Sequence, residues 1–229
     1  MYLRNPEFAS YTNRREAGRL LADILRRSYG GRSDLLVLAL PRGGVPIGVE
    51  IARGLDVPLD ILLVRKLGVP GHDELAMGAI ASGGVRVLNR SVLGHLGIEE
   101  DSIEAVTARE RRELERRERS YRGERPQPSI SARCVVLVDD GLATGSTMKA
   151  AAAAVRQGSP SRIVVAVPVA PPDTVEGLRR EVEDVVCPLT PEPFGGVGAW
   201  YDDFRQVPDD EVRQLLEESW AQRDQAKKT

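Results

Sequence analysis

Cysteine, lysine and aromatic residues are all scarce in this chain of 229 residues. The two cysteines, Cys134 and Cys187, stand alone beside apolar runs and belong to no Cys-x-x-Cys or Cys/His cluster. We therefore expect two reduced core thiols rather than a disulfide or a metal site. No apolar run approaches the roughly 20 residues of a membrane span, and the N-terminus lacks the apolar segment of a signal peptide. A soluble protein of the cytoplasm, without a membrane partner, is expected.

A large excess of charge of one sign is also lacking, because the chain has 32 basic and 34 acidic residues and a formal net charge of −2. Only four of the basic residues are lysines, so arginine supplies nearly all the positive charge. Dedicated nucleic-acid-binding proteins usually carry a basic excess, and we do not expect nucleic acid as a partner. The length and the hydrophobic content of 41% suffice for one sizeable core. That composition excludes collagen, a disulfide-stapled mini-protein and a disordered chain.

Several apolar runs are too continuous for strands with one solvated face, so we expect strands that are covered on both faces. These runs alternate with stretches compatible with helices, which predicts an α/β fold with a doubly wound, mostly parallel sheet. The expected strands cover residues 35–40, 59–64, 135–138 and 163–167, with a short strand at 182–187, and the expected helices between them cover residues 46–53, 146–157 and 174–183. An amphipathic helix precedes them. Asn13 and Glu16 have capping-box spacing at its start, and Gly30-Gly31 ends it.

Two segments depart from this alternation. Residues 65–100 are interpreted as an excursion of glycine-rich loops with a short strand at residues 85–88. Residues 101–122 predict a charged helix capped by Asp101, with Glu113/Arg117 and Glu115/Arg119 as ion pairs one turn apart. Its arginines could contact RNA, but the alternating signs favour a solvated, salt-bridged face. A last helix is expected from Asp209.

The chemistry concentrates where the strand at residues 135–138 leads into Asp139 and Asp140 and then into a turn of small residues before a helix. Open α/β sheets bind ligands outside the carboxyl ends of their strands. The backbone N–H groups of residues 143–147, with three side-chain hydroxyls, would surround an anion at the helix N-terminus. Walker A and Gly-x-Gly-x-x-Gly motifs are absent. The pattern predicts a sugar-phosphate site.

The string Val-Asp-Asp-Gly-Leu-Ala-Thr-Gly-Ser-Thr-Met resembles the 5-phosphoribosyl-1-pyrophosphate (PRPP) motif of type I phosphoribosyltransferases, and it is especially similar to the adenine phosphoribosyltransferase form. The resemblance implies that Asp139 and Asp140 contact the ribose hydroxyls, directly or through Mg²⁺ held largely by ligand oxygens and water. It assigns the 5′-phosphate to Ala143, Thr144, Gly145, Ser146 and Thr147. The chain departs from this motif at two positions. Gly141 stands where the motif usually has an apolar residue, and Ser146 stands where it frequently has a glycine.

A second element, Pro41-Arg42-Gly43-Gly44, follows the strand at residues 35–40. On its own it would indicate only a turn. In phosphoribosyltransferases this position holds the pyrophosphate loop, and the forked guanidinium of Arg42 suits two phosphate oxygens. The resemblance also predicts a cis peptide between Pro41 and Arg42.

A third element places Arg65 and Lys66 at the end of an apolar run, where two cations are costly unless they meet anions. The pair is similar to the start of the catalytic loop of adenine and orotate phosphoribosyltransferases, which implies a catalytic role at the pyrophosphate. The strings Arg-Lys-Leu-Gly and Glu-Leu-Ala-Met-Gly-Ala match a group of poorly characterised bacterial phosphoribosyltransferase-like proteins. His72 or Glu74 could assist proton movement at the acceptor or be inert loop residues.

Four of the ten aromatic residues gather in one C-terminal segment: Phe194, Trp200, Tyr201 and Phe204. The family's hood stacks the nucleobase on an aromatic ring, so Phe194, Trp200 and Tyr201 are candidates for base binding. A hydrophobic plug under a loop is the other interpretation. Asp202 or Asp203 could contact the edges of the base.

Together these features predict one domain over residues 1–229, with a type I phosphoribosyltransferase core at about 34–190, a helical insertion at 95–125 and a hood at about 188–207 joined by the N-terminal segment. The expected activity is Mg²⁺-dependent transfer of phosphoribosyl from PRPP to a nitrogen of a nucleobase-like acceptor, with release of pyrophosphate. The alternative is a regulatory module of the same fold that binds PRPP or a nucleotide. A receiver domain fits poorly, because Thr-Gly-Ser-Thr follows the acids closely. A homodimer is compatible with either function.

Overall fold

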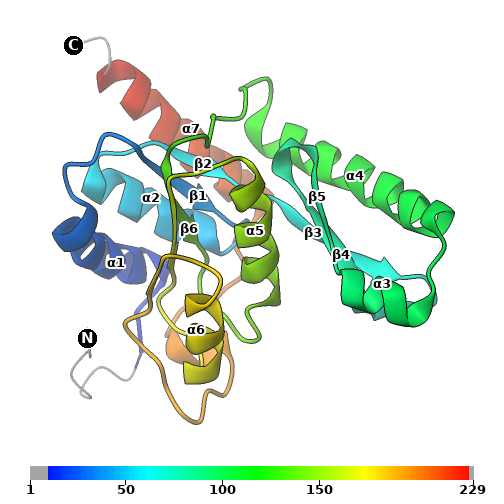
Figure 1. Cartoon of the computed structure of the whole chain (residues 1–229). Coiled ribbons are helices and arrows are strands. Elements are labelled where there is room, and N and C mark those ends of the chain that lie inside the picture. Colours follow the sequence, from blue (N-terminus) through cyan, green and yellow to red (C-terminus); the bar gives the residue numbers. More distant parts are fainter. Residues whose placement is uncertain (1–9, 227–229) are drawn as a thin grey trace.

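The computed structural model describes residues 10–226, apart from the side chains of residues 73, 74 and 226. Its central sheet has five parallel strands in the order β2-β1-β6-β7-β8. Figure 1 labels the first three of them, β2, β1 and β6. The strands are β1 (Leu35–Ala39), β2 (Leu59–Ile61), β6 (Cys134–Val138), β7 (Arg162–Ala166) and β8 (Asp184–Val186). The predicted α/β class and parallel sheet are confirmed.

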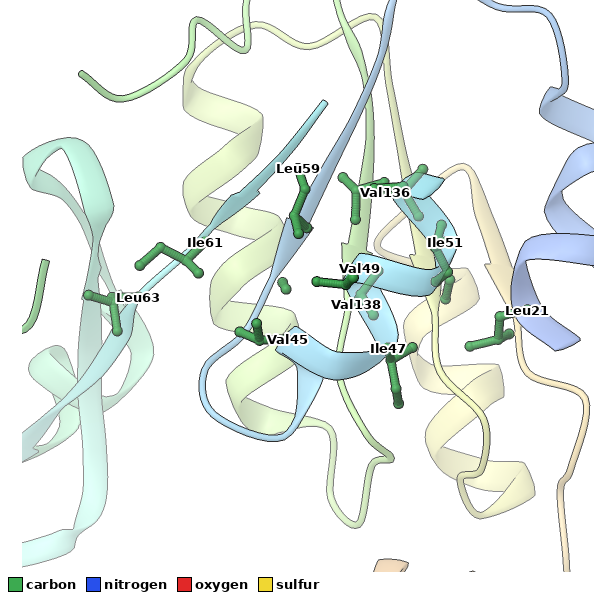
Figure 2. Close-up of a cluster of buried hydrophobic side chains, with 14 of the residues drawn as sticks. Leu21, Val45, Ile47, Val49, Ile51, Leu59, Ile61, Leu63, Val136 and Val138 are labelled. Carbon is green, nitrogen blue, oxygen red and sulfur yellow. The ribbon is translucent and has the colours of Figure 1, made fainter. Parts of the chain in front are cut away.

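Both faces of this sheet are covered, which explains why its strands are continuously apolar. In β6, Val136 and Val138 belong to a buried cluster that includes residues of three helices on one face of the sheet, and Val135 and Leu137 belong to a second cluster with two helices on the other. Figure 2 shows the first of these clusters around Val136 and Val138. The helices on that face are α1 (Arg14–Tyr29), α2 (Gly44–Leu55) and α7 (Asp209–Ala226), and those opposite are α5 (Ser146–Gln157) and α6 (Pro172–Arg179).

The start of α1 follows the capping pattern of the sequence. The Asn13 side chain accepts a hydrogen bond from the Glu16 N–H at 3.1 Å. In return, the Glu16 carboxylate accepts one from the Thr12 N–H at 2.6 Å. Two backbone donors at the helix start are thereby satisfied.

Residues 64–122 form an arm that projects from the central sheet (Figure 1). It contains an antiparallel sheet of β3 (Val64–Val69), β4 (His72–Ala81) and β5 (Val85–Leu88), followed by α3 (Arg90–Leu96) and α4 (Glu100–Arg122). The strand at 85–88 is confirmed, but the expectation of glycine-rich loops around it is wrong. The pairing shifts register on both sides of Gly68, which breaks the two-residue periodicity on which a strand is recognised.

Helix α4 begins one residue earlier than predicted, and its N-cap is Glu99 rather than Asp101. The N–H groups of Ser102 and Ile103 already bond to the Glu99 carbonyl at 3.0 and 3.2 Å, which places Asp101 inside the first turn. Both expected ion pairs are present, Glu113–Arg117 at 2.8 Å and Glu115–Arg119 at 3.9 Å.

Both cysteines are free thiols, Cys134 buried and Cys187 half-buried. This agrees with the prediction that they form no disulfide. Within residues 10–226, none of the helices combines the length and the apolar content that crossing a bilayer requires.

Candidate active site

The candidate site lies at the carboxyl ends of β1 and β6, which are neighbours in the sheet. From β1 the chain passes through α2 to β2 on one side, and from β6 it passes through α5 to β7 on the other. The two connections diverge, and such a switch point is where doubly wound sheets bind their ligands. The segments predicted to bind pyrophosphate and ribose both start at this edge.

The two segments touch closely. The Leu40 N–H donates to the Val138 carbonyl at 2.8 Å. A Cβ atom added to Gly43 would lie 1.9 Å from an Asp140 carboxylate oxygen, so only glycine allows this approach. The peptide between Pro41 and Arg42 is cis, as predicted. The loop after β1 is therefore packed against the acidic pair after β6.

Asp139 and Asp140 share a half-buried environment at the end of β6. The Asp140 N–H donates to an Asp139 carboxylate oxygen at 2.9 Å. Burial and the neighbouring Asp140 charge raise the pKa of Asp139 well above its usual value. Burial also raises the pKa of Asp140, but the Arg14 guanidinium opposes this rise. The two adjacent carboxylates are thus electrostatically unequal.

Arg14, at the start of α1, is the main site residue that the sequence reasoning missed. Its Nε and Nη2 atoms both donate to one Asp140 oxygen, at 2.8 and 2.7 Å. Its Nη1 donates to the Arg205 carbonyl at 2.9 Å, and its guanidinium lies 4.0 Å from the centre of the Phe204 ring. A signal was present, because Arg14 is one turn before Ala17 and Gly18 on the buried face of the helix.

The C-terminal aromatic segment packs against the acidic pair. Tyr201 is 6% exposed, and its hydroxyl donates to the Asp140 carbonyl at 2.6 Å. Its ring stacks on Phe204 at 5.1 Å, and burial raises its pKa. The Trp200 indole N–H donates to the Phe194 carbonyl at 2.7 Å. Tyr201 is thus a buried support of the acids, whereas Phe194 and Trp200 are half-buried.

Gly141 connects this segment to the motif. A Cβ atom at Gly141 would lie 2.5 Å from a Val197 methyl carbon. The aromatic segment therefore sits directly on the chain that follows Asp140. This contact explains why glycine stands where the PRPP motif usually has an apolar residue.

The turn before α5 offers several polar groups to an anion. The Thr144 and Ser146 hydroxyl oxygens lie 3.0 Å apart and are exposed, as is Thr147. The Thr174 hydroxyl fixes the turn from outside by donating to the Ala143 carbonyl at 2.7 Å. Helix α5 begins at Ser146, so its first N–H groups lack partners within the helix.

The three basic residues predicted for the site, Arg42, Arg65 and Lys66, have different partners and different exposure. Arg42 forms a long ion pair of 3.6 Å with Asp209 of α7. Arg65 is held by Glu110 of α4, with Nε and Nη2 at 2.6 and 2.5 Å from one carboxylate oxygen. Lys66 is exposed and, as the next residue of β3, points to the opposite face of the strand. Arg65 and Lys66 therefore do not act side by side.

His72 begins β4 at the tip of the hairpin, opposite Val69, and is exposed. Arg65 pairs with Ile80 near the base of the same hairpin, so the structure does not bring His72 and Arg65 together. The side chain of Glu74 lies outside the described residues. Asp202 accepts a hydrogen bond from the Ser10 hydroxyl at 2.5 Å, and Asp203 pairs with Arg205 at 2.7 Å.

Among the described residues, no three Asp, Glu, His or Cys side chains gather closely enough to hold a metal ion. Asp139 and Asp140 nevertheless supply carboxylate oxygens, which hard cations prefer. The site therefore fits a magnesium ion only if phosphate oxygens and water provide most of its ligands.

A doubly wound sheet with an acidic pair and a hydroxyl-rich turn before a helix at its switch point is typical of α/β proteins suited to phosphorylated ligands. Comparison with known families specifies that class. The model of the phosphoribosyl transferase domain matches residues 9–198. The chain belongs to this family.

Relatives agree with this assignment. A Mycobacterium tuberculosis protein provisionally named a phosphoribosyl transferase, found in two strains, is 43% identical over 207 residues, which are 90% of this chain. The match covers 46% of that relative, so the chain spans about half its length. A crystal structure of a protein from Thermus thermophilus is 44% identical and superposes with a TM-score of 0.83, covering 91% of this chain and 98% of that one.

Proposed function

We propose that the chain catalyses Mg²⁺-dependent transfer of a phosphoribosyl group from PRPP to a nitrogen of a nucleobase-like acceptor, with release of pyrophosphate. The observation that carries the proposal is the meeting of the Asp139–Asp140 pair, the Arg42 loop and the turn at residues 143–147 at one edge of the sheet. These groups match the three polar parts of PRPP, namely its ribose hydroxyls, its pyrophosphate and its 5′-phosphate.

The chain's own groups would act mainly through charge and position. Such transfers develop positive charge on the ribose ring, and the Asp139–Asp140 pair lies where it can offset that charge. The turn at residues 143–147 would hold the 5′-phosphate, and Pro41, Arg42, Gly43 and Gly44 would hold the pyrophosphate. Magnesium, when bound, would neutralise pyrophosphate oxygens. Lys66 would approach them from the exposed face of β3, and Arg65 would position that strand through Glu110.

The acceptor would bind beside the aromatic segment. Phe194 and Trp200 are half-buried, so part of each ring remains accessible for stacking. Tyr201 would contribute by supporting Asp140 rather than by facing the base.

Pyrophosphate release from PRPP across a panel of nucleobases, with Mg²⁺, tests this function. We expect turnover with at least one base and its loss in the double variant Asp139→Asn, Asp140→Asn. Asp173→Asn is a control for the loss of one carboxylate, because this residue of α6 is exposed and is not one of the acids after β6. Unchanged turnover in the double variant, or no binding of PRPP to the wild type, would contradict the proposal.

One observation favours a second function. Asp140 and Arg65 are both already engaged in ion pairs within the protein, as they would be in a module that binds PRPP without turning it over. A calorimetric titration distinguishes the two functions. Saturable binding of PRPP without pyrophosphate release, for every base tested, would identify a regulatory module.

A further inference from the structure

Asp209 forms an ion pair with Arg42, the basic residue of the predicted pyrophosphate loop. Its Oδ1 atom lies 3.6 Å from Nη1 of Arg42, although it is the first residue of α7, the last helix of the chain. The same Oδ1 atom accepts a hydrogen bond of 2.5 Å from the Tyr121 hydroxyl of α4. A carboxylate from another part of the chain thus stands beside Arg42, where phosphate oxygens are expected.

The two partners of this ion pair are fixed to different degrees. Tyr121 is 6% exposed and belongs to the hydrophobic core, so its hydroxyl anchors Asp209. This hydrogen bond, with the charges of Arg42 and Arg117, lowers the pKa of Asp209 and keeps it ionised near neutral pH. The Arg42 side chain is 36% exposed, and its pairing distance is long. Exposed pairs of this kind are weak, so Arg42 can leave while Asp209 stays.

An incoming pyrophosphate group would then meet both attraction and repulsion. It must draw Arg42 from Asp209, and the anchored carboxylate remains nearby as a like charge. We propose that Asp209 competes with pyrophosphate for Arg42, which weakens the binding of free pyrophosphate and favours its release. Asp209 is therefore a positioning residue for the leaving group. The inference rests on the proposed function.

Calorimetric titration of inorganic pyrophosphate with Mg²⁺ into the wild type, Asp209→Asn and Asp210→Asn tests this role. Asp210 lies in the same first turn of α7 and is exposed, so its variant loses an equal charge from the same helical turn. We expect Asp209→Asn to bind pyrophosphate about threefold more tightly than the wild type. Asp210→Asn should bind it like the wild type, and Asp209→Glu, which keeps the charge, should resemble the wild type.

Two other outcomes distinguish a failure of the role of Asp209 from a failure of the proposed function. If the wild type binds pyrophosphate and Asp209→Asn binds it no more tightly than Asp210→Asn, the role of Asp209 is wrong and the proposed function stands. If the wild type and all variants bind neither pyrophosphate nor PRPP, both are overturned. Denaturant unfolding of the two asparagine variants checks that their folded states are equally stable.

Discussion

The Arg14–Asp140 ion pair gives two neighbouring carboxylates different properties. One Asp140 oxygen forms an ion pair with the Arg14 guanidinium. An Asp139 oxygen instead accepts a hydrogen bond from the Asp140 N–H, and the negative charge of Asp140 lies next to it. Burial raises the pKa of both acids, and Asp139 is the more easily protonated of the two because the Arg14 guanidinium opposes the rise at Asp140. Because Arg14 also stacks on Phe204, this asymmetry is coupled to the aromatic segment.

Replacing Arg14 by Gln should shift the pH dependence of pyrophosphate release. Arg14 opposes the rise that burial causes in the pKa of Asp140, so without it this pKa rises further. Asp140 then loses its proton only at higher pH, and the acid limb of the pH–rate profile should move up by about one pH unit. Arg15→Gln is the control, because Arg15 is the exposed neighbour in the same helical turn. Identical acid limbs in the two variants would refute the role of Arg14.

Among the elements, those whose signal lies within a few residues were predictable. Helix α5 begins and ends at the predicted Ser146 and Gln157, because Gly145 and Gly158 flank it. The strands of the central sheet were predictable because burial on both faces makes them continuously apolar. Strands β3 and β4 were missed, since a register shift and small residues such as Gly78 leave no clear alternation.

The residues of the candidate site also divide into those that a local sequence pattern identifies and those that it does not. Asp139, Asp140 and the turn that follows them are contiguous, so their sequence pattern identified them as a site. Arg14 and Asp209 reach the site only through tertiary packing, Arg14 across 126 positions of the chain. The spacing of Arg14 from Ala17 and Gly18 places it on the buried face of α1, but no local pattern indicates that its partner is Asp140.

Helix α4 is fastened to the central sheet by a buried ion pair. Arg122, its last residue, donates to one Asp60 oxygen at 3.0 and 3.1 Å and to the Ile61 carbonyl at 3.1 Å. The two side chains are 6% and 4% exposed. Burial raises the pKa of Asp60, and the Arg122 charge opposes this rise. Removing the arginine would leave a buried carboxylate uncompensated.

We therefore expect Arg122→Met to lower the free energy of unfolding by about 3 kcal/mol or more at neutral pH. With a higher folded-state pKa, Asp60 binds its proton more tightly in the folded than in the unfolded state, so the deficit shrinks as the pH falls. Arg119→Met is the control, because its pair with Glu115 is exposed and should contribute less than about 1 kcal/mol. Denaturant unfolding at two pH values measures both. Equal losses in the two variants would show that the buried pair does not hold the helix.

At the scale of the whole molecule, the arm and the central sheet share one hydrophobic core. Leu67 of β3 and Ile103 and Leu114 of α4 belong to the same buried cluster as Val136 and Val138 of β6. Helix α4 also carries Glu110 and Tyr121, which hold Arg65 and Asp209 respectively. The arm thus contributes to the arrangement of the site as well as to the core, and it should not be separable from either.

Because the cluster is continuous, the arm and the central sheet should unfold together in one transition. Both tryptophans, Trp200 and Trp220, lie outside the arm, so their fluorescence reports on the rest of the molecule. Far-UV circular dichroism also reports on α4, which has 23 residues. We expect the two signals to give the same midpoint in urea. If the circular dichroism falls first while the fluorescence remains native, the arm unfolds independently, and the contacts of Glu110 and Tyr121 are too weak to couple it to the site. Arg119→Met, which alters only an exposed pair of the arm, should leave the coincidence of the two signals unchanged.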